Sequence, residues 1–156
     1  MAIELPEKVK DELERFKQNI SGRVKFVEKE NLHLTLKFLG EVNPNNVIER
    51  LKAVKHRTFT MRLKGVGFFP NERFIRVIWV GVDLGRDKVK RLYDDISAVL
   101  GDGEEFVPHV TLARVKGRVK VLNRDFTSSE FEVKGFSLFK STLTPKGPVY
   151  EKIHSF

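Results

Sequence analysis

The spacing of apolar residues predicts three amphipathic helices. One is expected from Pro6 to Asn19, with Gly22 stopping it, a second opens at Asn43-Pro44, and a third covers about 87–100 before Gly101-Asp102-Gly103. Each has apolar side chains at helical spacing: Val9, Leu13, Phe16 and Ile20 in the first; Val47, Leu51 and Val54 in the second; Val89, Leu92, Ile96 and Val99 in the third.

Apolar runs with strand character separate and follow these helices. Phe59, Met61 and Leu63 alternate with polar residues, and the turn Pro70-Asn71-Glu72 predicts a hairpin to the next strand. The order of strands and helices is too irregular for a wound parallel sheet, so we predict an α+β fold with mostly antiparallel sheets. The other strands are expected at 24–27, 32–39, 74–82, 107–115, 131–143 and 149–156, the last two flanking a turn at 145–148.

The length and composition are those of one soluble globular domain covering residues 1–156, with 40% hydrophobic and 32% charged residues. The absence of cysteine excludes disulfides and thiolate chemistry. There is no signal-peptide pattern and no apolar run near the ~20 residues that span a bilayer, so we expect a cytoplasmic protein. The net charge of +8 favours a polyanionic partner such as nucleic acid, although a basic surplus can also serve solubility alone.

A His-x-Thr-x pattern occurs twice, as His33-Leu34-Thr35-Leu36 and His109-Val110-Thr111-Leu112. Both copies lie in predicted strands, where residues i and i+2 project from the same face. Each copy therefore presents an imidazole beside a hydroxyl. The chain has four histidines, so half of them belong to this pattern.

The two copies are separated by 109 − 33 = 76 residues, about half the chain, and both follow a predicted helix. Self-similarity at this period predicts two lobes related by an approximate two-fold axis, with the motifs at the seam. Two histidines near their ordinary pKa of about 6.5 can act as base and acid, and threonine hydroxyls can bind phosphate oxygens. The alternative is that both pairs are ordinary strand residues. No carboxylate or His/Cys cluster accompanies them, so nothing in the sequence requires a metal.

The residues around both motifs resemble the two-histidine (2H) phosphoesterase superfamily, specifically its bacterial and archaeal RNA 2′,3′-cyclic phosphodiesterase branch, also named 2′-5′ RNA ligase. Family members usually open with a fuller β-strand than 1–5 provides here, which leaves one sheet edge open to question. The resemblance covers nearly the whole chain and is carried by 30–40 (ENLHLTLKFLG), Phe69-Pro70, 108–114 (PHVTLAR) and 141–150 (STLTPKGPVY).

This resemblance implies two pseudo-symmetric lobes with a groove that holds both motifs. It implies metal-independent hydrolysis of a terminal RNA 2′,3′-cyclic phosphate to a 2′-phosphate, with no cofactor. His109 is expected to activate water, His33 to protonate the leaving 3′ oxygen, and Thr35 and Thr111 to hold phosphate oxygens; which histidine is the acid stays open. The expected partner is RNA with cyclic phosphate ends, such as tRNA fragments, and we expect a monomer without a membrane association.

Two further residues carry over from the family. Arg114 is expected to pair with the phosphate, with a surface charge as the alternative, and Phe38 is expected to stack on a nucleobase or to lie in the core. Each follows its histidine by five positions, which is the wrong parity for the His/Thr face, so each strand must end or bulge after Leu36 and Leu112.

Other positions give weaker indications. Arg114, Lys116, Arg118 and Lys120 alternate, as an RNA track or a solvated strand edge would. Tyr150 is a further candidate for the groove, whereas His56 is expected at a helix end and His154 in a structural or exposed position.

Two alternatives to hydrolysis remain at this point. The same groups can catalyse 2′-5′ ligation as the main reaction. A protein that binds RNA ends without turnover would show the same basic charge.

Overall fold

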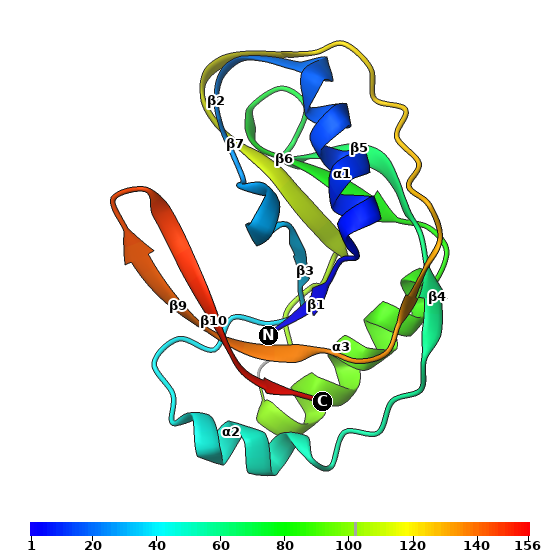
Figure 1. Cartoon of the computed structure of the whole chain (residues 1–156), viewed down its shortest axis with the longest axis vertical. Coiled ribbons are helices and arrows are strands. Elements are labelled where there is room, and N and C mark those ends of the chain that lie inside the picture. Colours follow the sequence, from blue (N-terminus) through cyan, green and yellow to red (C-terminus); the bar gives the residue numbers. More distant parts are fainter. Residues whose placement is uncertain (102) are drawn as a thin grey trace.

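A computed structural model describes residues 1–101 and 103–156 (Figure 1). Asp102, which was expected in the turn after the third helix, lies outside the described residues. Within the described part of the chain, no helix is long and apolar enough to cross a membrane. The helices are α1 (Glu7–Phe16), α2 (Pro44–Leu51) and α3 (Arg86–Leu100), and the strands are β1 (Ala2–Glu4), β2 (Ile20–Phe26), β3 (His33–Thr35), β4 (Phe59–Met61), β5 (Leu63–Pro70), β6 (Ile75–Val82), β7 (His109–Val121), β8 (Phe131–Val133), β9 (Ser137–Thr144) and β10 (Gly147–Ser155).

The three predicted helices are confirmed, and their apolar stripes face the core. Val9, Leu13 and Phe16 of α1 are buried, and a 3₁₀ turn at Lys17–Asn19 extends this helix. The side chain of Asn43 caps α2 by accepting from the backbone N–H of Asn45, and Pro44 occupies the first turn, where its missing N–H costs nothing.

One antiparallel sheet of eight strands forms the centre of the molecule, which confirms the α+β class. Its order is β10-β9-β1-β3-β7-β6-β5, and β2 pairs with the far part of β7. Strands β3 and β7 are joined through one Cα pair, Leu34 opposite Val110. The expected lobes are therefore two halves of one continuous sheet. Figure 1 shows α1 beside β5–β7, and α2 and α3 near the half that contains β1 and β9.

The half-chain repeat is visible in the strand registers. In each half a strand leads into a helix and is then paired, antiparallel, with a His-x-Thr strand: β1, α1 and β3 in the first half, and β6, α3 and β7 in the second. The two registers match residue by residue: Glu4↔His33, Ile3↔Leu34 and Ala2↔Thr35 correspond to Gly81↔His109, Val80↔Val110 and Trp79↔Thr111.

The strand expected at 32–39 is shorter, because β3 ends at Thr35. The chain turns away there, and the backbone N–H groups of Leu36 and Lys37 both donate to the carbonyl of Met1, the residue before β1. The N-terminal strand is short, as expected, but β1 is not a sheet edge: it lies between β3 and β9. The apolar run at 32–39 could not show that these backbone donors find their acceptor at Met1, which is distant in the sequence.

The expectation that Gly22 ends the first helix is wrong. The helical segment ends by Asn19, and Gly22 lies inside β2, which begins at Ile20 instead of residue 24. Gly22 has φ 117° at an irregularity in the β2–β7 ladder, and a Cβ there would lie 2.2 Å from the Arg118 carbonyl oxygen. Glycine is required by the close approach of the partner strand.

Three other strand predictions need correction. The run 59–63 divides into β4, which pairs with β8 in a separate two-stranded sheet, and the start of β5, which forms the predicted hairpin with β6. The segment 131–143 likewise contains two strands, β8 and β9. The strand predicted at 107–115 is β7, which continues to Val121 because β2 pairs with its far end.

We predict that Leu34→Ala destabilises the whole fold. Leu34 is fully buried at the Cα pair that joins β3 to β7. Removing a buried leucine side chain costs about 2–5 kcal/mol of unfolding free energy, which urea unfolding would measure. Leu122→Ala is the control, because Leu122 is 64% exposed and should change stability by only ~0.5 kcal/mol. Equal losses of unfolding free energy in Leu34→Ala and Leu122→Ala would contradict a special role of the Leu34–Val110 pair.

Candidate active site

The two His-x-Thr motifs lie side by side on antiparallel neighbours. Because Leu34 pairs with Val110, the register places His33 opposite Thr111 and Thr35 opposite His109. Leu34 and Val110 are fully buried on one face of the sheet, and the four polar residues are half-buried on the other. The pairing thus brings two imidazoles and two hydroxyls to one face around a local two-fold axis.

Both histidines are held in the same way. His33 Nδ1 lies 2.5 Å from the Asn31 carbonyl oxygen, and His109 Nδ1 lies 2.7 Å from the Val107 carbonyl oxygen. A carbonyl only accepts, so Nδ1–H donates in each case and Nε2 carries the lone pair of the neutral ring. His33 Nε2 lies 3.0 Å from the Thr35 hydroxyl, which donates to it. Each imidazole is therefore oriented for proton transfer at Nε2.

Burial acts on both histidines in the same direction. Desolvation lowers the pKa of His33, opposed by its bond to the Asn31 carbonyl, and the positive N-terminus and Lys10 lower it further. Desolvation likewise lowers the pKa of His109, opposed by the bond to Val107. The neutral form of both rings is thus favoured in the free protein.

Aromatic rings surround each imidazole. Tyr150 from β10 lies edge-on to His33, with ring centroids 5.2 Å apart. Phe69 and Trp79 lie 5.0 and 5.7 Å from the His109 ring, and Trp79 is also the strand partner of Thr111. Sequence reasoning gave no role to Trp79, because only the pairing of β6 with β7 brings its ring beside His109. Tyr150, predicted as a candidate for the groove, lies beside His33.

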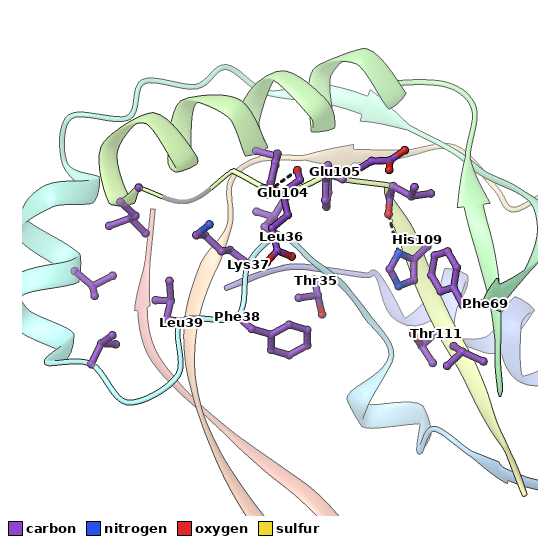
Figure 2. Close-up of a pocket in the computed structure, with 18 of the residues that line it drawn as sticks. Thr35, Leu36, Lys37, Phe38, Leu39, Phe69, Glu104, Glu105, His109 and Thr111 are labelled. Atoms are coloured by element: carbon purple, nitrogen blue, oxygen red, sulfur yellow. Dashed lines mark hydrogen bonds between the residues drawn. The ribbon is translucent and has the colours of Figure 1, made fainter.

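The motif residues line two adjoining cavities. The larger, of about 1110 Å³, contains Thr35, His109 and Thr111 and extends toward α2 and α3. The smaller, of about 180 Å³, contains all four motif residues and extends between β2 and the β9–β10 turn. Figure 2 shows the Phe38 ring on the side of the pocket across from His109, Thr111 and Phe69.

Arg114 and Phe38 line both cavities. On β7 the register shifts between Thr111 and Ala113, so Leu112 is an extra residue and Arg114 returns to the face of the motif. The first strand ends before Leu36, and Phe38 is 82% exposed instead of packed in the core. The expected break in parity is confirmed at both motifs, but it comes earlier than predicted: β3 ends at Thr35, before Leu36, and the extra residue on β7 is Leu112 itself.

The other two histidines lie elsewhere, outside the described lining of these cavities. His56 lies beyond the end of α2, with its ring 5.6 Å from Phe136, so the expected position at the helix terminus is wrong. His154 is exposed on β10 beside Phe156, as expected.

Comparison with known proteins gives consistent matches over nearly the whole chain. The family model described as LigT like Phosphoesterase matches residues 3–79 and 82–150, and each segment contains one His-x-Thr motif. Proteins named RNA 2′,3′-cyclic phosphodiesterase are similar: one from Methanocaldococcus jannaschii is 39% identical, covering 98% of this chain and 96% of the relative. One from Archaeoglobus fulgidus is 35% identical, covering 100% and 97%.

Solved structures share the fold. The protein TT0787 of Thermus thermophilus has a TM-score of 0.84 at 32% identity, covering 99% of this chain and 94% of that one. E. coli LigT complexed with 3′-AMP has a TM-score of 0.84 at 24% identity, with the same coverage.

We predict that both active-site imidazoles titrate below the ordinary histidine value of about 6.5 and are Nδ1–H tautomers when neutral. The reason is the burial that lowers the pKa of each ring and the carbonyl that holds each Nδ1–H. NMR titration of ring ¹³C and ¹⁵N signals would measure both properties, with His33→Gln and His109→Gln used for assignment. A midpoint above that value, or an Nε2–H tautomer, would contradict this site geometry.

Proposed function

Because the chain belongs to the LigT-like phosphoesterase family, we propose that it is an RNA 2′,3′-cyclic phosphodiesterase, a phosphoric diester hydrolase that opens terminal cyclic phosphates to 2′-phosphates. The observation that carries the proposal is the paired register of the two motifs. It gives one pocket two oriented imidazoles and two hydroxyls, which is the equipment for acid-base chemistry on a phosphodiester.

In this mechanism the cyclic phosphate lies between His33 and His109. His109 Nε2 takes a proton from water as the water oxygen attacks phosphorus. The bond from phosphorus to the 3′ oxygen breaks, and protonated His33 gives its proton to that oxygen, so that the phosphate remains on the 2′ oxygen. In-line attack needs base and acid on opposite sides of phosphorus, which motifs on two strands related by a two-fold can supply.

Binding of the substrate favours the protonated form of the histidine that acts as the acid. Burial favours the neutral form of both rings, whereas the acid must be protonated. A bound phosphate anion favours the charged imidazolium and therefore raises the pKa of the neighbouring histidine. The Arg114 guanidinium, together with the hydroxyls of Thr35 and Thr111, binds the non-bridging oxygens and stabilises the charge that develops on them.

The finer parts of the proposal concern partners and location. Phe38, exposed at the pocket, stacks on the terminal nucleobase, a contact that accepts any base. The RNA ends include those of tRNA fragments, and the protein works as a cytoplasmic monomer without a metal or cofactor.

We expect His33→Ala and His109→Ala each to lower kcat for a cyclic-ended oligonucleotide by about 10²–10⁴-fold, because each removes a proton-transfer group. Product analysis should show a 2′-phosphate, and EDTA should leave the rate of the unmutated protein unchanged. Full activity of either variant, or a 3′-phosphate product, would disprove the mechanism. Adding an acceptor with a 5′-hydroxyl tests whether the same groups favour 2′-5′ ligation.

The pH dependence of kcat/KM should be bell-shaped. The base must be neutral and the acid protonated, so activity falls below the pKa of the base and above the pKa of the acid. Since burial lowers the pKa of both histidines in the free protein, the alkaline fall should begin below about pH 6.5. The pH profile of kcat reports the enzyme with substrate bound. Its alkaline fall should lie at higher pH, because the bound phosphate raises the pKa of the histidine that acts as the acid.

The variants test the roles in the same experiment. The residual activity of His33→Ala should lack the alkaline fall, and that of His109→Ala the acidic one. The reverse pattern would exchange acid and base, and a kcat/KM that is flat from about pH 5 to 8 would exclude a histidine pair.

A further inference from the structure

A ribbon of two strands leads away from the active site and carries a continuous cationic face. It consists of β2 paired with residues 113–121 of β7, and we call it the β2–β7 ribbon. Neither strand contains an aspartate or glutamate in this stretch. Its cations are Arg23, Lys25, Arg114, Lys116, Arg118 and Lys120, and within the described residues no ion pair involves any of the six.

All six cations are exposed. Val115, Val119 and Val121 pack against the core, so Arg114 and Lys120 face away from it, while Lys116 and Arg118 lie in the irregular stretch of β7 between Val115 and Val119. Lys25 is paired with Arg114 across the ribbon. Arg23 lies over Gly117, where a Cβ would be 3.1 Å from the arginine side chain.

The cationic face is continuous with the catalytic pocket. The bulge at Leu112 turns Arg114 to the His/Thr side, and Arg114 and Lys25 both line the smaller cavity. From Arg114 the exposed side chains of Lys116, Arg118 and Lys120 continue outward along β7, through the irregular stretch between Val115 and Val119.

The opposite wall of the smaller cavity has a different character. It comes from the β9–β10 hairpin, where Pro148 and Tyr150 line the cavity together with Lys146. Leu143 is the strand partner of Pro148 and is 85% exposed, and Phe139 lies 6.4 Å from Tyr150 between ring centroids. Cations beside aromatic and apolar surface suit single-stranded nucleic acid, whose phosphates contact the charges and whose bases contact the rings.

We propose that the β2–β7 ribbon binds the single-stranded RNA on the 5′ side of the terminal nucleotide, with successive phosphates at Arg114, Lys116, Arg118 and Lys120. The inference rests on the proposed function, because the cyclic phosphate between the two histidines sets where the track begins. The enzyme then prefers an RNA chain to an isolated cyclic nucleotide, and this preference depends on salt.

The test compares two substrates, a 2′,3′-cyclic uridine mononucleotide and a uridine hexanucleotide with a 2′,3′-cyclic end. We expect the unmutated protein to have a kcat/KM at least about tenfold higher on the hexanucleotide at low salt. The triple variant Lys116→Gln, Arg118→Gln, Lys120→Gln should lose this gain and keep its rate on the mononucleotide. Its log–log salt dependence of hexanucleotide binding should be less steep by about 2, as three phosphate contacts predict.

A matched control removes the same charge elsewhere. Lys88→Gln, Lys90→Gln, Arg91→Gln changes three exposed cations on α3 that lie outside the described lining of both cavities, and this variant should keep the hexanucleotide gain. The proposal is overturned if the ribbon variant keeps the gain, if the control loses as much, or if the ribbon variant loses equally on the mononucleotide.

Binding of a hexanucleotide with a 2′-phosphate end, followed by fluorescence anisotropy, separates this inference from the proposed function. If the unmutated protein turns over neither substrate, the proposed function fails. Weaker binding by the ribbon variant than by the control would still support the track, and equal binding would overturn it.

Discussion

The organisation of this protein depends on the pairing of Leu34 with Val110. An antiparallel pair of strands has a local two-fold axis, and both central side chains are fully buried on the same face. The residue on either side of each must then point to the other face, where His33 meets Thr111 and Thr35 meets His109. A shift of one residue would bury the polar groups and expose the leucine and valine, so the core itself maintains the register of the site.

The same burial determines the electrostatics of the pocket. Aromatic rings from β5, β6 and β10 and the half-buried position of both histidines lower the pKa of each, while backbone carbonyls fix Nδ1–H. The two imidazoles are therefore favoured as neutral in the free protein, and the positive charge of the pocket comes from Arg114 and Lys25. Both kinds of group favour a bound anion, because electrostatic attraction is less screened where water is excluded.

Much of the fold could be predicted locally. The helices at Glu7–Phe16, Pro44–Leu51 and Arg86–Leu100 follow from apolar periodicity and a visible cap at Asn43. The errors occur where a distant segment supplies the partner. Leu36 and Lys37 donate to Met1 beside β1, Gly22 lies in a strand because β2 pairs with the far part of β7, and β4 pairs with β8 across some seventy residues.

The amino-acid sequence was enough to predict two His-x-Thr pairs at a half-chain interval, the two-fold that they imply, and the strand breaks that Phe38 and Arg114 require. These follow from residue type, spacing and side-chain parity, which are local properties. The folded structure was needed to show that the Leu34–Val110 pair joins the halves, that Trp79 and Phe69 lie beside His109 while Tyr150 borders His33, and that an exposed cationic face continues outward from Arg114. Those features arise from strand pairing between segments that are distant in the sequence. Which segments pair depends on the packing of the whole core and not on local sequence.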